Sequence, residues 1–115
     1  MTITIYHNPA CGTSRSALTA IREAGYDPQI IEYLKAGWTK PQLQALFAAA
    51  GVTAAQALRL ANSPAADLGL TAEGVTEDQI LDAMVAHPGL VQRPFVVTPK
   101  GTALCRPADR IAALL

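Results

Sequence analysis

The N-terminal third of the chain has the pattern of a strand, a turn, a helix and a second strand. Residues 2–6 alternate Thr and Ile and end in an aromatic residue, which is typical of a short strand, and Asn8-Pro9 then favours a turn. Apolar residues at helical spacing predict a helix over residues 12–24, with Gly25 as its C-terminal stop. Residues 29–34 have the composition of a second strand. Two strands joined through a helix form a βαβ unit, with parallel strands and a right-handed crossover.

The middle of the chain has the signals of short helices. Thr39 can cap a helix that ends near Gly51. Residues 53–60 predict another short helix. The segment Thr76-Glu77-Asp78-Gln79 has the capping-box pattern and begins a third helix. We therefore expect a mostly helical region over roughly residues 38–92.

The C-terminal region has the pattern of a hairpin followed by a helix. Residues 95–98 are β-rich, Pro99-Lys100-Gly101 favours a turn, and residues 102–105 have the pattern of the returning strand. Pro107 then begins a last helix. The order βαβ, helical insertion, ββα predicts an α/β protein with a thioredoxin-like fold. We expect the whole chain, residues 1–115, to form a single domain.

Charge and cysteine content limit the classes of function. Nine basic and nine acidic residues leave no net charge, so nothing indicates a nucleic-acid surface. No segment approaches the roughly 18 apolar residues of a membrane span, and residues 1–6 lack the basic start of a signal peptide. Two widely separated cysteines, Cys11 and Cys105, fit a reduced intracellular chain better than a secreted disulfide scaffold. We therefore expect a cytoplasmic monomer that binds neither nucleic acid nor membrane.

Cys11 is the candidate nucleophile. It stands where the first strand gives way to the helix, so free N–H groups and the helix dipole favour its thiolate. His7 could add positive charge. The alternative is that Cys11 fills a gap in the core, as free cysteine often does. A turn at the carboxyl end of a parallel strand favours the catalytic interpretation. The predicted anion-binding residues beside it are Gly12, Thr13, Ser14 and Arg15.

Neighbouring residues exclude two cysteine motifs. Ser14 stands where a Cys-x-x-Cys motif would have its second cysteine, so the segment has no local resolving thiol. Ala17 stands where a Cys-x5-Arg phosphatase loop would need arginine. Cys11 must then be resolved by an external thiol, such as glutathione, or by a distant cysteine. Histidines and cysteines are too scattered for a metal site and no glycine-rich nucleotide loop is present, so we expect no metal and no bound cofactor.

Several segments spread over nearly the whole chain carry an unusual combination of residues. They are Ile5–Arg15, Ile31–Leu34, Leu68–Leu70, His87-Pro88, Arg93–Pro99, Gly101-Thr102 and Leu104–Pro107. In these segments the chain resembles the glutaredoxin-coupled arsenate reductases, which have a thioredoxin-like fold with a helical insertion. The resemblance also implies a cis peptide bond at Arg93-Pro94. The chain ends at Leu115, where the longer members of that family carry a further segment.

The resemblance implies an activity in arsenical resistance. Cys11 would attack the arsenic of arsenate and form a covalent adduct; glutathione would attack that adduct, and glutaredoxin would reduce the product so that arsenite leaves. Glutathione would be a co-substrate and glutaredoxin a protein partner. Arg59, Arg93 and Arg106 would hold the oxyanion, because a guanidinium group can bind two oxygens at once. His7 would favour the thiolate electrostatically.

Other interpretations of these residues stay open. Without the family, Arg59 on its predicted helix would be a solvated surface charge, and Arg15 could be a helix-face charge. His7 could simply cap the loop, and Cys105 on a late strand could be structural. The alternative function is a non-enzymatic redox-sensing or binding module like the Spx-type regulators, which bind RNA polymerase. Those regulators usually carry Cys-x-x-Cys, which this chain lacks.

Overall fold

The computed structural model describes residues 2–115, which divide into two compact units. The first unit comprises the N-terminal segment through Ala36 together with Arg93–Leu115. The second comprises Gly37–Gln92 and contains the predicted helical insertion. Met1 lies outside the described residues. That residues 1–115 form a single domain stays a prediction.

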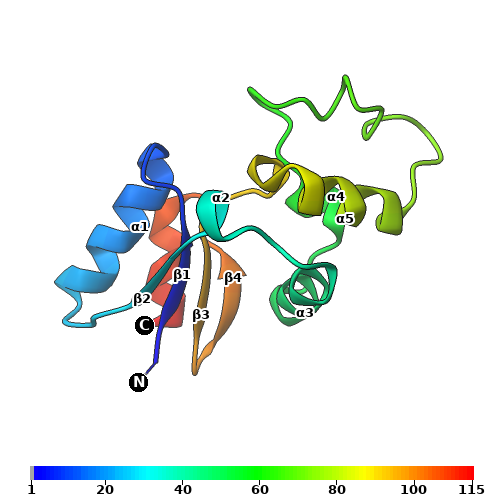
Figure 1. The fold of residues 1–115 in the computed structure, drawn as a ribbon. Helices are drawn as coiled ribbons and strands as arrows, with labels where there is room; N and C mark the ends of the chain where they lie inside the picture. Colours follow the sequence, from blue (N-terminus) through cyan, green and yellow to red (C-terminus); the bar gives the residue numbers. More distant parts are fainter. Residues whose placement is uncertain (1) are drawn as a thin grey trace. The chain divides into compact units, whose positions relative to one another are not determined.

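A four-stranded mixed sheet organises the first unit (Figure 1). Its strands are β1 (Thr4–His7), β2 (Gln29–Glu32), β3 (Phe95–Thr98) and β4 (Gly101–Leu104). They lie in the order β2-β1-β3-β4, with β1 and β2 parallel and β3 antiparallel to both β1 and β4. The parallel pair of the predicted βαβ unit and the predicted C-terminal hairpin are therefore confirmed. The strand order brings the hairpin next to the strand that precedes Cys11.

One helix and one 3₁₀ segment pack against this sheet. α1 (Gly12–Glu23) connects β1 to β2, and η2 (Ala108–Leu114) follows β4. In Figure 1 the blue α1 and the red η2 lie side by side. Gly25, with φ 92°, follows α1 as predicted, because glycine adopts the left-handed region without strain. The shared core consists of Ile3, Ile5, Ala17, Leu18, Ile21, Val96, Cys105, Ile111 and Leu114.

The second strand is shorter than predicted. We expected it to run to residue 34, but β2 ends at Glu32 and Tyr33–Ala36 forms the short helix α2. The cause is the neighbouring strand: β1 ends at His7, which is the partner of Glu32, and the chain then turns at Asn8 and Pro9. A residue at position 33 therefore has no β1 partner for its backbone groups.

Three helices organise the second unit. They are α3 (Lys40–Ala50), α4 (Ala54–Ala57) and α5 (Glu77–Ala86), and the 3₁₀ segment η1 (Pro88–Leu90) follows them. Each helix begins with a capping box, at Thr39, Thr53 and Thr76, which confirms the predicted box at Thr76. α5 packs against α3 and α4, and its buried residues are Ile80, Leu81 and Met84.

The predicted helix over residues 53–60 is wrong in its second half. α4 ends at Ala57, and Leu58 forms an isolated antiparallel bridge with Val91. The N–H of Arg59 donates to the carbonyl of Leu90 at 2.7 Å. Because this pairing involves residues more than thirty positions away, the local sequence pattern could not predict it. Arg59 therefore lies beyond the end of α4 rather than on a helix.

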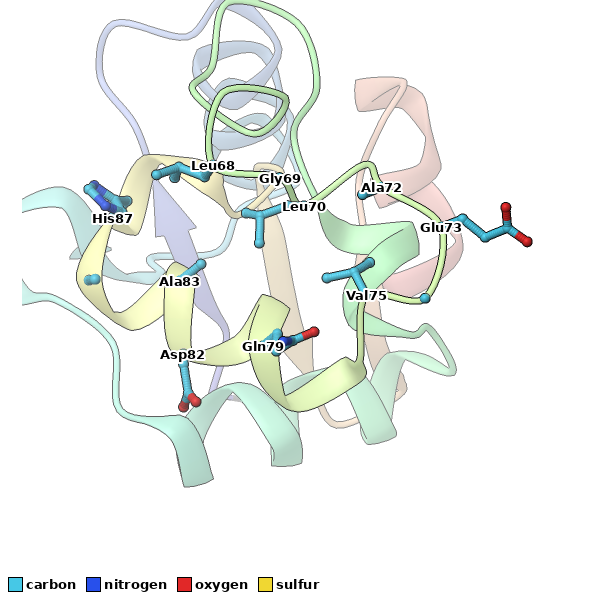
Figure 2. A pocket seen from close by; sticks show the side chains of 12 residues that line it. Leu68, Gly69, Leu70, Ala72, Glu73, Val75, Gln79, Asp82, Ala83 and His87 are labelled. Carbon is cyan, nitrogen blue, oxygen red and sulfur yellow. The ribbon is translucent and has the colours of Figure 1, made fainter.

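A hollow of about 580 Å³ lies in the second unit between the loop 68–75 and α5 (Figure 2). Figure 2 shows Leu70 and Val75 turned toward α5, whereas Glu73 points away from the other labelled side chains. None of the predicted site residues lines this hollow. Within residues 2–115, no helix has the length and apolar character that crossing a membrane would require.

Candidate active site

The turn between β1 and α1 holds Cys11 directly before the first residue of the helix. The carbonyl of Asn8 accepts the N–H of Cys11 at 3.0 Å, and the Asn8 side-chain Oδ1 accepts the N–H of Ala10 at 3.0 Å. Cys11 is the N-cap residue of α1, with extended backbone angles of φ −96° and ψ 121°. Its sulfur therefore lies beside the free N–H groups of the first helical turn, as predicted. Cys11 is half-buried and Asn8 is buried, so the turn is well packed around a reachable thiol.

Two arginines from the C-terminal hairpin act on this thiol. Arg106 follows β4, and its Nη1 lies 3.8 Å from the Cys11 Sγ and 3.1 Å from the carbonyl oxygen of Arg93. Arg93 precedes β3, and its side chain also favours the Cys11 thiolate and lowers the pKa of that thiol. The Arg93-Pro94 peptide bond is cis, as the resemblance implied, and so is Arg106-Pro107, which we did not predict. The structure thus brings together Cys11, Arg93 and Arg106.

The ionisation of Cys11 reflects two opposing effects. Burial by itself raises the pKa of the thiol, because the thiolate loses hydration. The backbone N–H of Ser14, the guanidinium groups of Arg106 and Arg93, and the backbone N–H of Thr13 all favour the thiolate and together lower the pKa of Cys11 to about 7. A substantial part of the Cys11 thiol is therefore ionised at neutral pH, as a cysteine nucleophile requires.

His7 contacts Ser14 rather than the thiol. A 2.6 Å hydrogen bond joins His7 Nδ1 to the Ser14 Oγ, which also accepts the N–H of Asn8 at 3.1 Å. Burial is the main cause that lowers the pKa of His7 from 6.5; Glu32 raises that pKa, and nearby arginines lower it. The imidazole is therefore largely neutral at pH 7. Its assignment as an electrostatic aid to the thiolate stays a prediction, and its observed contact holds the first turn of α1 in place.

The other predicted anion-binding residues differ in their environment. Gly12 is exposed and Thr13 is half-buried at the start of α1. Arg15 is exposed, and its Nη1 donates to the carbonyl of Pro9 at 2.9 Å, which fixes the guanidinium beside the turn. Ser14 is fully buried, so its side chain supports the turn while its N–H acts on the Cys11 sulfur.

Arg59 belongs to the second unit, unlike the other predicted site residues. Its carbonyl accepts the hydroxyl of Ser63 at 2.5 Å, and its N–H is bound to Leu90. The role of Arg59 as a third oxyanion-binding arginine stays a prediction.

This arrangement can bind and attack a small oxyanion. Guanidinium groups and backbone N–H groups both act on the Cys11 sulfur. Both kinds of donor can stabilise negative charge on an oxyanion as well as on the thiolate. Among residues 2–115, no group of three or more His, Cys, Asp or Glu side chains is placed to hold a metal ion.

A family model and several relatives match nearly the whole chain. The model of the ArsC family covers residues 6–114. The chain belongs to the ArsC family. It is 62% identical over 113 residues to arsenate reductase ArsI2 of Synechocystis sp., a match that covers 98% of this chain and 81% of that protein. It is 51% identical over 115 residues to the arsenate reductase of Rhizobium meliloti, covering 100% of this chain and 82% of that one. The solved structure of arsenate reductase from Vibrio cholerae is 30% identical and matches with a TM-score of 0.95, over 100% of this chain and 98% of that one.

These comparisons confirm the predicted family and the thioredoxin-like fold of this ArsC-family chain. Two supporting residues had been missed or misinterpreted in the sequence. Asn8 was treated only as a turn former, although its side chain and carbonyl both hold the Cys11 turn. Ser14 was predicted as an anion-binding residue, and in the structure its hydroxyl also binds His7 and accepts the N–H of Asn8. The role of Asn8 could have been predicted from the Asn-Pro pair directly after a strand, because such a pair is typical of a turn held by the Asn side chain.

Proposed function

We propose that this chain is an arsenate reductase in which Cys11 is the nucleophile. The observation that carries the proposal is the 3.8 Å approach of the Arg106 guanidinium to a Cys11 sulfur whose pKa is about 7. Relatives with the name arsenate reductase, 62% and 51% identical to the chain, support arsenate as the substrate. The proposal includes action as a cytoplasmic monomer with no bound cofactor.

The first step is a substitution at arsenic. The Cys11 thiolate attacks the arsenic of a protonated arsenate, a sulfur–arsenic bond forms, and one oxygen leaves as water. Arsenic stays in the pentavalent state, so this step needs no reductant. Arg93 and Arg106 hold the remaining oxygens, and they balance the charge that moves from sulfur to oxygen. Arg59 is the third oxyanion-binding arginine of the proposal.

The second stage reduces arsenic with two electrons from external thiols. Glutathione adds its sulfur to the arsenic of the adduct and releases a second water. A glutaredoxin thiolate then attacks the glutathione sulfur, so that a mixed disulfide forms and the electron pair of the arsenic–sulfur bond stays on arsenic. Water displaces the resulting trivalent arsenic from Cys11 as arsenite. The two sulfurs are oxidised while arsenic is reduced, which balances the reaction.

The environment of Cys105 supports an external rather than an internal reductant. Cys105 is fully buried in the core of the first unit. Burial raises the pKa of its thiol to about 11, although Arg110 acts in the opposite direction. A buried, protonated thiol is a poor attacking group, so Cys105 does not serve as the resolving thiol in this proposal.

A coupled assay tests the proposal. Purified protein with glutathione, glutaredoxin, glutathione reductase and NADPH should consume NADPH when arsenate is added. Cys11→Ser should abolish the arsenate-dependent rate, and Cys105→Ala should retain it. Arg93→Ala and Arg106→Ala should lower turnover far more than Arg22→Ala, which removes an exposed charge of α1. A wild-type protein that forms mixed disulfides at Cys11 but shows no arsenate-dependent turnover would instead support the redox-sensing module.

A further inference from the structure

The peptide group between Pro9 and Ala10 is held at both ends by side chains. Its carbonyl oxygen, on Pro9, accepts a hydrogen bond from the Nη1 of Arg15 at 2.9 Å. Its N–H, on Ala10, donates to the Asn8 Oδ1 at 3.0 Å. The next N–H, that of Cys11, donates to the carbonyl oxygen of Asn8 at 3.0 Å. The backbone that leads into Cys11 is therefore fixed by one side chain that precedes it in the sequence and by one that follows it.

The Arg15 side chain reaches back over the start of its own helix. Arg15 belongs to the first turn of α1, which begins at Gly12. A Cβ added to Gly12 would lie 3.7 Å from the Nη2 of Arg15. The backbone N–H of Arg15 donates to the carbonyl of Cys11 at 3.0 Å. The guanidinium group therefore extends from the residue after Cys11 to Pro9, two residues before it.

A positive charge at this place is unfavourable for the helix itself. The N-terminus of a helix carries a partial positive charge, so acidic residues stabilise the first turn and basic residues destabilise it. α5 follows this rule with Glu77 and Asp78 in its first turn. The first turn of α1 contains no acidic residue and includes Arg15. Residues that break such a local rule tend to lie at functional sites, so the contact that Arg15 makes beyond its helix indicates its role.

Two observations favour an action of Arg15 on the backbone over an action on the sulfur. One of its Nη groups is already bound by the Pro9 carbonyl. Burial raises the pKa of Cys11, and the guanidinium groups that oppose this effect come from the C-terminal hairpin rather than from α1. The charge of Arg15 acts instead on His7, whose pKa is lowered mainly by burial and further by Arg22 and Arg15.

We infer that Arg15 is a positioning residue, which holds the Pro9–Ala10 peptide group so that Cys11 presents its sulfur to the donors of the site. This inference rests on the proposed function, because that sulfur is the nucleophile of the reaction. It gives Arg15 a role different from the oxyanion contact expected from the sequence. Loss of the side chain frees the Pro9 carbonyl and lets the peptide group rotate. The sulfur then spends part of its time away from the N–H and guanidinium groups that stabilise its thiolate.

Exchange with the uncharged disulfide dithiodipyridine tests this role without arsenate. The Cys11 thiolate attacks one sulfur, a disulfide forms between the protein and one pyridyl group, and thiopyridine leaves. The rate is measured as a function of pH in about 0.1 M and in about 1 M sodium chloride, because salt screens a direct effect of charge on the thiolate but does not replace the bond to the turn. The test variant is Arg15→Ala. Arg22→Ala is the matched control, since it removes an exposed arginine of the same helix that also lowers the pKa of His7.

The expected result is a shift of the rate profile in Arg15→Ala alone. A turn that holds the sulfur beside its donors for only about a third of the time raises the pKa of Cys11 by about half a unit. This shift should be present at both salt concentrations, and Arg22→Ala should resemble the wild type. The amide hydrogen of Ala10 should also exchange with solvent faster in Arg15→Ala, because its peptide group is no longer held at the Pro9 carbonyl.

Several outcomes would overturn the inference. They are an unchanged rate profile or unchanged Ala10 exchange in Arg15→Ala, a shift that disappears at high salt, and an equal shift in Arg22→Ala. A lower arsenate-dependent rate in Arg15→Ala with an unchanged disulfide profile would show instead that Arg15 binds the oxyanion. Because the disulfide reaction needs no arsenate, a shift confined to Arg15→Ala in a protein without arsenate turnover would reject the proposed reaction but not the positioning role.

Discussion

Removing the positive charge of Arg106 should raise the pKa of Cys11. Arg106 Nη1 lies 3.8 Å from the sulfur, and at that distance a unit charge stabilises a thiolate by about 1 kcal/mol in a water-like dielectric. In Arg106→Gln the pKa of Cys11 should therefore rise from about 7 to about 8. It should rise no further, because Arg93 and the backbone N–H groups of Thr13 and Ser14 still favour the thiolate.

This change should alter the exchange rate of Cys11 in opposite directions at low and high pH. At pH 6 a rise in pKa from 7 to 8 lowers the thiolate fraction about ninefold. The thiolate of higher pKa is also more nucleophilic, by about threefold for this change. Arg106→Gln should therefore react about threefold more slowly than the wild type at pH 6 and about 2.5-fold faster at pH 9. The two rate profiles should cross between pH 7 and pH 8.

Stopped-flow reaction with the uncharged disulfide dithiodipyridine measures these profiles. Cys105 should not contribute, because its side chain is fully buried. Arg110→Gln is the matched control, since it removes an exposed arginine that does not act on Cys11. Its profile should coincide with that of the wild type. Parallel profiles for Arg106→Gln and the wild type, or the same crossing in Arg110→Gln, would refute the assigned effect of Arg106.

Three further predictions concern stability and the second thiol. Burial lowers the pKa of His7 from 6.5, so the unfolded chain binds a proton at this residue more readily than the folded chain does. The stability that neutral His7 contributes is therefore fully present above pH 6.5 and is lost as the pH falls below that value. In urea unfolding, the free energy of unfolding of His7→Gln should fall less between pH 7 and pH 5 than that of the wild type. Thr39→Ala should lower the free energy of unfolding by about 1 kcal/mol by removing the cap of α3, whereas Thr39→Ser should retain most of it in thermal unfolding. Cys105 should react with dithiodipyridine only after the protein is unfolded in urea, because the native thiol is buried and its pKa is raised to about 11.

Features determined by neighbouring residues could be predicted from the sequence. The capping box at Thr76 depends on two side chains within one turn, and Gly25 ends α1 through its own backbone conformation. The predicted strand over residues 95–98 coincides with β3. Each of these signals lies within a few residues of the element that it defines, so no tertiary information is needed.

Features determined by distant partners could not be predicted in the same way. The pattern of residues 53–60 is compatible with a helix, but the bridge between Leu58 and Val91 ends α4 early. Tyr33 continues a strand pattern, but β1 offers no partner at that position. A hydrogen-bonding partner on a distant segment, present for Leu58 and absent for Tyr33, overrode local preference at both places.

The same division applies to the candidate site. The position of Cys11 at a helix start follows from local sequence, and the prolines beside Arg93 and Arg106 mark strand ends. Their convergence on one sulfur depends on β3 pairing with both β1 and β4, which no local pattern specifies. The contact of His7 with Ser14 was also unpredictable, because either residue could have satisfied its polar groups in solvent.

Comparing the two cysteines separates the effect of burial on a thiol's pKa from the effect of nearby hydrogen-bond donors. Burial raises the pKa of both thiols, since both thiolates lose hydration. At Cys105 little opposes this effect: Arg110 alone acts against it, and the pKa is about 11. At Cys11 two guanidinium groups and two backbone N–H groups exceed it, and the pKa is about 7. The difference in pKa between the two thiols therefore depends on converging donors. Because those donors come from both ends of the chain, the pKa of Cys11 should stay near 7 only while α1 and the β3–β4 hairpin are folded together. It should return to the ordinary range of a cysteine in the same transition that unfolds the sheet.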